Sequence, residues 1–188
     1  EIRNPETPLA SLWALDFEPA IEGKNRELVQ KALQRARERT DALAAGHQPW
    51  TDKRGKIARG FISAVDGSTQ PYGVVIPAGY DPANPMRLDV VLHGSRRATG
   101  MGELTFMNEF DAGDQGGPPA PDVNYIEVHP LGRLGENTYR FEGETDVDEA
   151  IEAVCRSHNI DRTRIVLRGS SLGGVGAWQL GLKRPDRF

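Results

Sequence analysis

The sequence has one cysteine, few aromatic residues and no long apolar run. Its single cysteine, Cys155, cannot form an intrachain disulfide and has no second cysteine beside it with which to bind a metal. No segment approaches the roughly 20 consecutive apolar residues that a membrane-spanning helix requires. The sequence therefore predicts neither a disulfide-stabilised scaffold nor a membrane span, and no spacing of His, Cys or carboxylate residues points to a metal or another cofactor.

The sequence also lacks a strong excess of charge of one sign. The chain carries 23 basic and 27 acidic residues, a formal net charge of −4, and the two signs are mixed along it. A nucleic-acid-binding protein would show a concentrated basic patch, so we expect no nucleic-acid partner. At 188 residues with 38% hydrophobic content, the chain suffices for one domain with a core or for part of a larger domain. No targeting pattern precedes the first predicted element, so the residues themselves do not indicate where the protein is located.

Two regions differ in their patterning. Residues 1–57 are predicted to form an irregular, proline-containing segment and an amphipathic helix from Lys24 to Ala45. The apolar stripe of this helix favours packing on its own domain, with a lid or a partner-binding face as the alternative. In residues 58–188, short apolar segments alternate with helical patterns. This alternation predicts an α/β fold, a mostly parallel sheet with helices on both faces.

The predicted elements of the second region are as follows. The strands are Phe61–Val65, Tyr72–Ile76, Leu88–Leu92, Val123–Val128 and Arg164–Leu167, and the helices are Glu103–Phe110, Asp146–His158 and Leu172–Lys183. Thr145 and Asp148 form an approximate capping box at the start of the second helix.

The last predicted strand runs directly into the last helix through Gly-x-Ser-x-Gly, the sequence of a nucleophile elbow. In such a tight turn the residues two before and two after the serine approach each other, and Gly169 and Gly173 fill those places around Ser171. The neighbouring Ser170 has no glycines at the matching positions. Ser171 is therefore the predicted nucleophile, the alternative being a plain glycine-rich turn. A nucleotide phosphate loop is disfavoured because no Gly-Lys-Ser/Thr follows.

Two turns are predicted to supply the oxyanion hole. The backbone N–H of Leu172, at the start of the last helix, benefits from the helix dipole. The strand ending at Leu92 continues into His93, Gly94 and Ser95, and the N–H groups of Gly94 and Ser95 are the second predicted donors. His93 is predicted to shape this turn, since in this architecture the catalytic acid and then the histidine follow the serine.

Further candidates for a substrate site lie beside these turns. His129 and Arg133 follow the strand Val123–Val128, so they are predicted at the same sheet edge as Ser171. With His93 they are candidate substrate-binding residues. The alternative is that they only satisfy carbonyl and carboxylate groups of the loops.

From about residue 59 to residue 188, these motifs resemble the N-terminal half of a known family. The chain resembles α/β-hydrolases of the prolyl oligopeptidase-like, esterase D-like and polyhydroxybutyrate depolymerase-like groups. The resemblance is carried by residues 70–73, 92–94, the helix from Asp146, residues 169–174 and the closing residues 184–188. It implies a serine esterase that forms an acyl-enzyme on Ser171, with a small-molecule or polysaccharide-linked ester as substrate. A prolyl oligopeptidase-like peptidase is the alternative, and the resemblance slightly favours a periplasmic or secreted protein.

One departure from the family stands out. Every histidine precedes Ser171: His47, His93, His129 and His158. The only later carboxylate, Asp186, lies past the far end of the predicted last helix. We therefore expect the catalytic acid and histidine to come from beyond residue 188, from the rest of the same catalytic domain, and this segment alone to be an incomplete and inactive piece. A non-catalytic binding or scaffold domain is the further alternative.

Overall fold

The computed structural model describes residues 14–18, 20–111, 113, 117–133, 137 and 139–188. Its elements, in chain order, are α2 (Gly23–Ala44), β1 (Gly55–Ile62), β2 (Thr69–Ile76), β3 (Met86–Leu92), α3 (Gly102–Phe110), β4 (Tyr125–Pro130), α4 (Glu142–Ser157), β5 (Ile160–Gly169) and α5 (Leu172–Lys183). Of the predicted irregular segment at the start, residues 1–13 and 19 lie outside the described residues, and residues 14–17 are helical.

The five strands form one sheet in the order β1-β2-β4-β3-β5. β2 pairs antiparallel with both β1 and β4, whereas β3 pairs parallel with β4 and β5. Among the described strands β2 alone runs against the others, which confirms the predicted mostly parallel sheet. The carboxyl ends of β3, β4 and β5 therefore meet at one edge, where ligand-binding loops gather in open α/β sheets.

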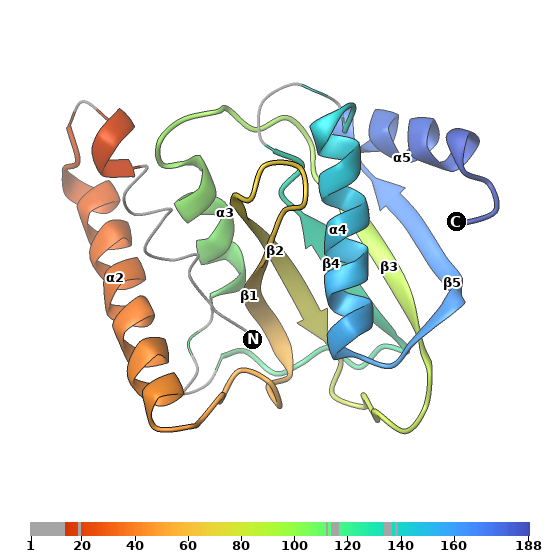
Figure 1. Ribbon diagram of the computed structural model, residues 1–188, viewed down its shortest axis with the longest axis horizontal. Helices are drawn as coiled ribbons and strands as arrows, with labels where there is room; N and C mark the ends of the chain where they lie inside the picture. Colours follow the sequence, from red (N-terminus) through yellow and green to blue (C-terminus); the bar gives the residue numbers. More distant parts are fainter. Residues whose placement is uncertain (1–13, 19, 112, 114–116, 134–136, 138) are drawn as a thin grey trace.

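Helices cover both faces of this sheet (Figure 1). Along β2, Val74 and Ile76 belong to the buried cluster under α4, while Val75 belongs to the buried cluster under α3. This alternation follows from the two-residue period of a strand, which sends successive side chains to opposite faces. In Figure 1 α4 crosses the front of the sheet, and α2 lies beside α3 at the left.

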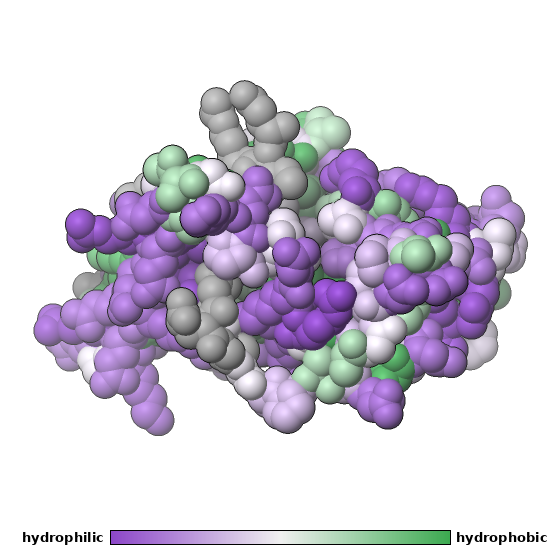
Figure 2. All heavy atoms as spheres, turned by 90° about the horizontal axis from the view of Figure 1, so that it is seen from below, coloured by the Kyte–Doolittle hydropathy of each residue, from purple (hydrophilic) through white to green (hydrophobic). Residues whose placement is uncertain are grey.

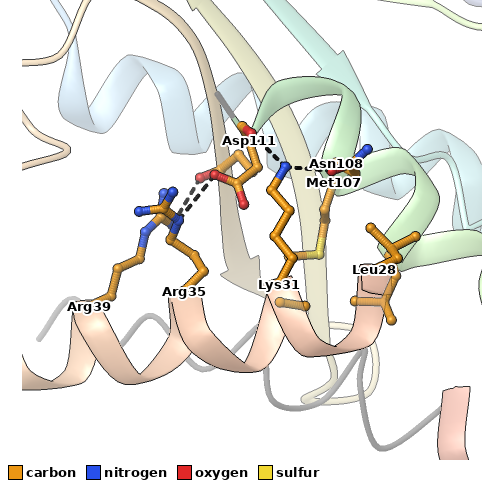
Figure 3. A pocket seen from close by; sticks show the side chains of 10 residues that line it. Leu28, Lys31, Arg35, Arg39, Met107, Asn108 and Asp111 are labelled. Carbon is orange, nitrogen blue, oxygen red and sulfur yellow. Dashed lines mark hydrogen bonds and ion pairs between the residues drawn. The ribbon is translucent and has the colours of Figure 1, made fainter. Parts of the chain in front are cut away.

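The α2 helix packs on its own domain, as the favoured interpretation of its stripe predicted. Figure 3 shows a pocket between α2 and α3 into which basic side chains of α2 point. Lys31 Nζ lies 2.7 Å from Asn108 Oδ1, and Arg35 Nε lies 3.2 Å from Asp111 Oδ1. Polar contacts as well as apolar ones thus hold α2 against α3. The predicted domain boundary at residue 58 falls inside β1, and the division itself stays a prediction.

Several predicted element boundaries differ from the structure, and two of the differences are large. The first strand was expected at Phe61–Val65, but β1 spans Gly55–Ile62 and the chain turns back after it. Ser63 N–H donates to Ser68 O at 2.8 Å, which places the apolar Ala64 and Val65 in the hairpin turn.

The helix expected to start at Asp146 begins at Glu142, with Phe141 as N-cap. Thr145 N–H already donates to Phe141 O at 3.3 Å, so Thr145 lies inside α4 and the predicted capping box is wrong.

Seen from below the view of Figure 1, the surface is mostly hydrophilic (Figure 2). No helix in the described part of the chain has both the length and the apolar character needed to span a membrane.

Candidate active site

The junction between β5 and α5 holds Ser171 in an unusual backbone conformation. Ser171 is the N-cap of α5, with φ 53° and ψ −125°. For a residue with a side chain, such a conformation costs roughly 1–3 kcal/mol. The residue is exposed, and its Oγ has no hydrogen-bond partner among the described residues. The turn therefore presents a free hydroxyl at the carboxyl edge of the sheet.

The two glycines of the motif leave no room for a side chain. A Cβ placed on Gly169 would lie 2.3 Å from Gly173 O, and a Cβ placed on Gly173 would lie 2.0 Å from Leu92 O. Both distances are far inside van der Waals contact. A Cβ on Gly174 would lie 3.5 Å from Gly169 O, an ordinary contact. The steric requirement inferred from the sequence thus applies to the two positions around Ser171.

The turn after β3 lies directly against the elbow. A Cβ placed on Gly94 would be 3.3 Å from Ser171 Cβ and 3.8 Å from Ser171 Oγ. Leu172 is the first residue of α5, a position whose N–H has no partner within the helix. The backbone of Gly94 is thus close to Ser171. The specific donors Leu172, Gly94 and Ser95 stay a prediction.

The ring of His93 is held by the backbone. Its Nδ1 lies 2.6 Å from Gly94 O and its Nε2 lies 2.8 Å from Leu131 O. A neutral imidazole has one N–H and can donate to one of these carbonyls at a time. Burial lowers the pKa of His93 by disfavouring the charged ring, while the two carbonyls act in the opposite direction. Both nitrogens face carbonyl oxygens, a geometry that suits a residue shaping the turn. A substrate contact by His93 stays a prediction.

Tyr139 reaches the same turn from the segment after β4. Its ring fits between two glycines, since a Cβ on Gly132 or on Gly176 would lie 2.6 Å from a ring carbon. Its hydroxyl donates to His93 O at 3.0 Å. Burial raises the pKa of Tyr139, so the phenol stays protonated. The sequence places Tyr139 in the loop after β4 but does not predict these contacts, because Gly176 and His93 are distant from it in the chain.

Asp146 anchors the segment that follows β4. It is fully buried on α4, and its Oδ2 accepts the N–H of Gly132 at 2.7 Å. Burial raises the pKa of Asp146 to about 7. The charge of Arg133, whose Nε lies 4.0 Å from Oδ1, acts in the opposite direction and lowers this pKa. The sequence placed Asp146 at a helix start, where this contact could not be foreseen.

The other two candidate substrate residues have partners within the domain. The strand predicted at Val123–Val128 is β4, Tyr125–Pro130, so His129 lies in the strand and not in the loop after it. Its Nε2 lies 2.9 Å from Glu127 Oε2. Arg133 donates to Asp66 Oδ2 at 2.8 Å and to Ser63 Oγ at 2.7 Å. These contacts fit the alternative of satisfied loop groups, and the substrate role of both residues stays a prediction.

In the part of the chain that the structure describes, no group of three or more His, Cys, Asp or Glu side chains is arranged to hold a metal ion.

Comparison with known proteins yields matches among solved structures. No protein-family model and no curated protein matches the chain. A substrate-bound structure of FphF, a fluorophosphonate-binding serine hydrolase of Staphylococcus aureus, is 17% identical with a TM-score of 0.52, and the match covers 72% of this chain and 55% of that one. A ferulic acid esterase is 19% identical with a TM-score of 0.50, over 71% of this chain and 56% of that one.

The chain thus spans just over half the length of these two structures. At such identities the likeness shows the fold. Together with the strand order and the elbow between β5 and α5, it shows that the chain has the α/β-hydrolase fold.

Proposed function

We propose that this chain supplies the nucleophile and the oxyanion hole of a serine hydrolase that cleaves carboxylic esters. The observation that carries the proposal is the strained backbone of Ser171, φ 53° and ψ −125°, which lifts an unpartnered hydroxyl above the carboxyl edge of the sheet. The close approach of Gly94 to that hydroxyl supports it, because an acyl-transfer site needs N–H donors beside the nucleophile.

The reaction has two halves. Ser171 Oγ attacks the ester carbonyl carbon while its proton passes to a histidine, and the tetrahedral oxyanion accepts hydrogen bonds from Leu172 N–H and from Gly94 or Ser95. The bond to the alkoxy oxygen then breaks, and the alcohol leaves with the histidine's proton. A water molecule, deprotonated by the same histidine, attacks the acyl-enzyme. The carboxylic acid is released and Ser171 regains its proton.

The histidine and the acid that orients it come, in this proposal, from beyond residue 188, in the rest of the same catalytic domain. The described histidines near the sheet have other partners: His93 faces two carbonyls and His129 contacts Glu127. Asp186 follows α5, a helix of 12 residues that starts at the elbow and is about 18 Å long, so it comes after the helix end that is remote from Ser171.

The substrate class rests on the resemblance in sequence and on the names of the two solved structures, a serine hydrolase and a ferulic acid esterase. Carboxylic esters, including aromatic acyl groups linked to polysaccharide, are the proposed substrates.

The test compares two adjacent serines in the natural full-length protein. Ser171→Ala should remove hydrolysis of a small aryl ester, by at least about 10,000-fold, because the nucleophile is lost. Labelling by a fluorophosphonate probe should disappear with it. Ser170→Ala is the matched control and should keep both activities within a few-fold. Turnover that survives in Ser171→Ala, or a probe bound to Ser170, would overturn the assignment.

A second candidate is a non-catalytic binding domain with a hydrolase fold. A full-length protein with no ester turnover and no fluorophosphonate labelling at Ser171 would support this candidate over the enzyme.

A further inference from the structure

The two peptide groups that carry the candidate donors of the β3 turn each have a polar side-chain atom close to their carbonyl oxygen. The carbonyl of the His93–Gly94 peptide accepts the Tyr139 hydroxyl at 3.0 Å. The carbonyl of the Gly94–Ser95 peptide lies 2.6 Å from His93 Nδ1. In a trans peptide the C=O and N–H bonds point to opposite sides of the chain, so fixing the carbonyl also fixes the direction of the N–H. Tyr139 therefore contacts the peptide group that carries the N–H of Gly94.

The ring of Tyr139 is itself immobilised. It is buried, with 4% of its surface exposed, and the missing side chains of Gly132 and Gly176 make the space for it. Gly132 is tied to α4 through Asp146, and Gly176 belongs to α5, the helix that starts at the elbow. The ring is thus held from two sides, by the Gly132 segment and by α5, the helix that begins after Ser171.

We propose that Tyr139 is a positioning residue of the oxyanion hole, which orients the Gly94 N–H toward the oxyanion that forms on Ser171. This inference rests on the proposed function. A hydrogen bond received by the peptide carbonyl also polarises the N–H of the same peptide and strengthens it as a donor. The packing of the ring alone would need no hydroxyl, so the two roles can be separated.

The test is Tyr139→Phe in the full-length protein, because this change removes the hydroxyl and keeps the ring. The expected result is a kcat for an aryl ester lowered roughly 10- to 100-fold with KM nearly unchanged, since the lost interaction serves only the transition state. Inhibition by an aryl boronic acid, which forms a tetrahedral adduct on the serine, should weaken by a similar factor. Tyr125→Phe, on β4, is the matched control and should leave all three quantities unchanged.

Gly176→Ala provides a second variant. Its methyl group would lie 2.6 Å from Cδ2 of Tyr139 and displace the ring. It should reproduce the kinetic defect of Tyr139→Phe, and the double variant should be little worse than either single one, because both act on the same contact.

The outcomes distinguish a failure of the positioning role of Tyr139 from a failure of the proposed hydrolase function. A Tyr139→Phe enzyme with wild-type kcat and boronate affinity would overturn the positioning role while the hydrolase function stands. A fall in thermal stability with kcat per folded molecule unchanged would also overturn it, in favour of packing. A wild-type protein without ester turnover would overturn the proposed function and this inference with it.

Discussion

Two turns meet at the candidate site, and they are fixed by different means. The elbow around Ser171 is fixed by backbone sterics: a positive φ at Ser171, and two positions closed to side chains, Gly169 by the elbow itself and Gly173 by the end of β3. The turn after β3 is fixed by side chains that bridge 38 residues, from His93 to Leu131, and 46 residues, from Tyr139 to His93. The first turn holds its shape without titratable groups. The second turn depends on the rest of the fold and on groups whose protonation changes with pH.

The strongest test of this difference is Gly173→Ala, because the elbow and the β3 turn touch at that residue. The new Cβ would lie 2.0 Å from Leu92 O, so backbone must move, and we expect the free energy of unfolding to fall by more than about 3 kcal/mol. Gly174→Ala is the matched control. Its Cβ would lie 3.5 Å from Gly169 O, and the gain in helix propensity should make it neutral or stabilising by up to about 1 kcal/mol. Urea unfolding of both variants measures the difference, and equal stabilities would contradict the steric account of the elbow.

The next test uses pH. Asp146, which supports the β3 turn through Gly132 and Tyr139, should titrate, whereas the elbow has no such group. The pKa of Asp146 is raised from 3.8 to about 7, so between about pH 4 and pH 7 the folded protein keeps a proton that the unfolded chain releases. The contribution of Asp146 to the free energy of unfolding is therefore largest at low pH and falls as pH rises through this window, by at most about 1.4 kcal/mol per pH unit. Above about pH 7 it is constant.

Asp146→Asn should remove this slope, because an amide oxygen can still accept the Gly132 N–H but does not titrate. The charged groups that face Asp146 are Arg133, Glu149 and Glu103, and they stay in the variant. Urea unfolding at pH 4.5, 6 and 8 compares the two proteins. Parallel curves for wild type and Asp146→Asn would show that the carboxyl titrates as it does in the unfolded chain.

The same difference explains which parts of the molecule could be predicted from the sequence. The mostly parallel sheet and the elbow at Ser171 were predicted, because strand period and the need for glycine are local properties of the chain. The first strand was misplaced, because Ala64 and Val65 are apolar and yet lie in a hairpin turn. His129 was placed in a loop because the alternating pattern of β4 continues past the last strongly apolar residue.

The contacts of Tyr139 and Asp146 could not be predicted from the sequence. Each depends on groups brought near it by folding: the His93 carbonyl and two glycines for Tyr139, and the Gly132 N–H for Asp146. The residues next to a tyrosine or an aspartate in the sequence do not reveal whether folding brings such partners to it. Only the packing of α4 and α5 on the sheet brings these contacts together.

The smallest expected effect concerns the strain at the nucleophile alone. Because φ is 53° at Ser171, glycine should fit there better than alanine, and Ser171→Gly should be more stable than Ser171→Ala by roughly 1 kcal/mol. Ser170 is not among the described residues with positive φ. At that position the order should reverse, because glycine loses more backbone freedom on folding. Thermal unfolding of the four variants checks this, and the same order at both serines would mean that the elbow stores no strain at Ser171 and that its shape, like that of the β3 turn, is held by contacts from elsewhere in the fold.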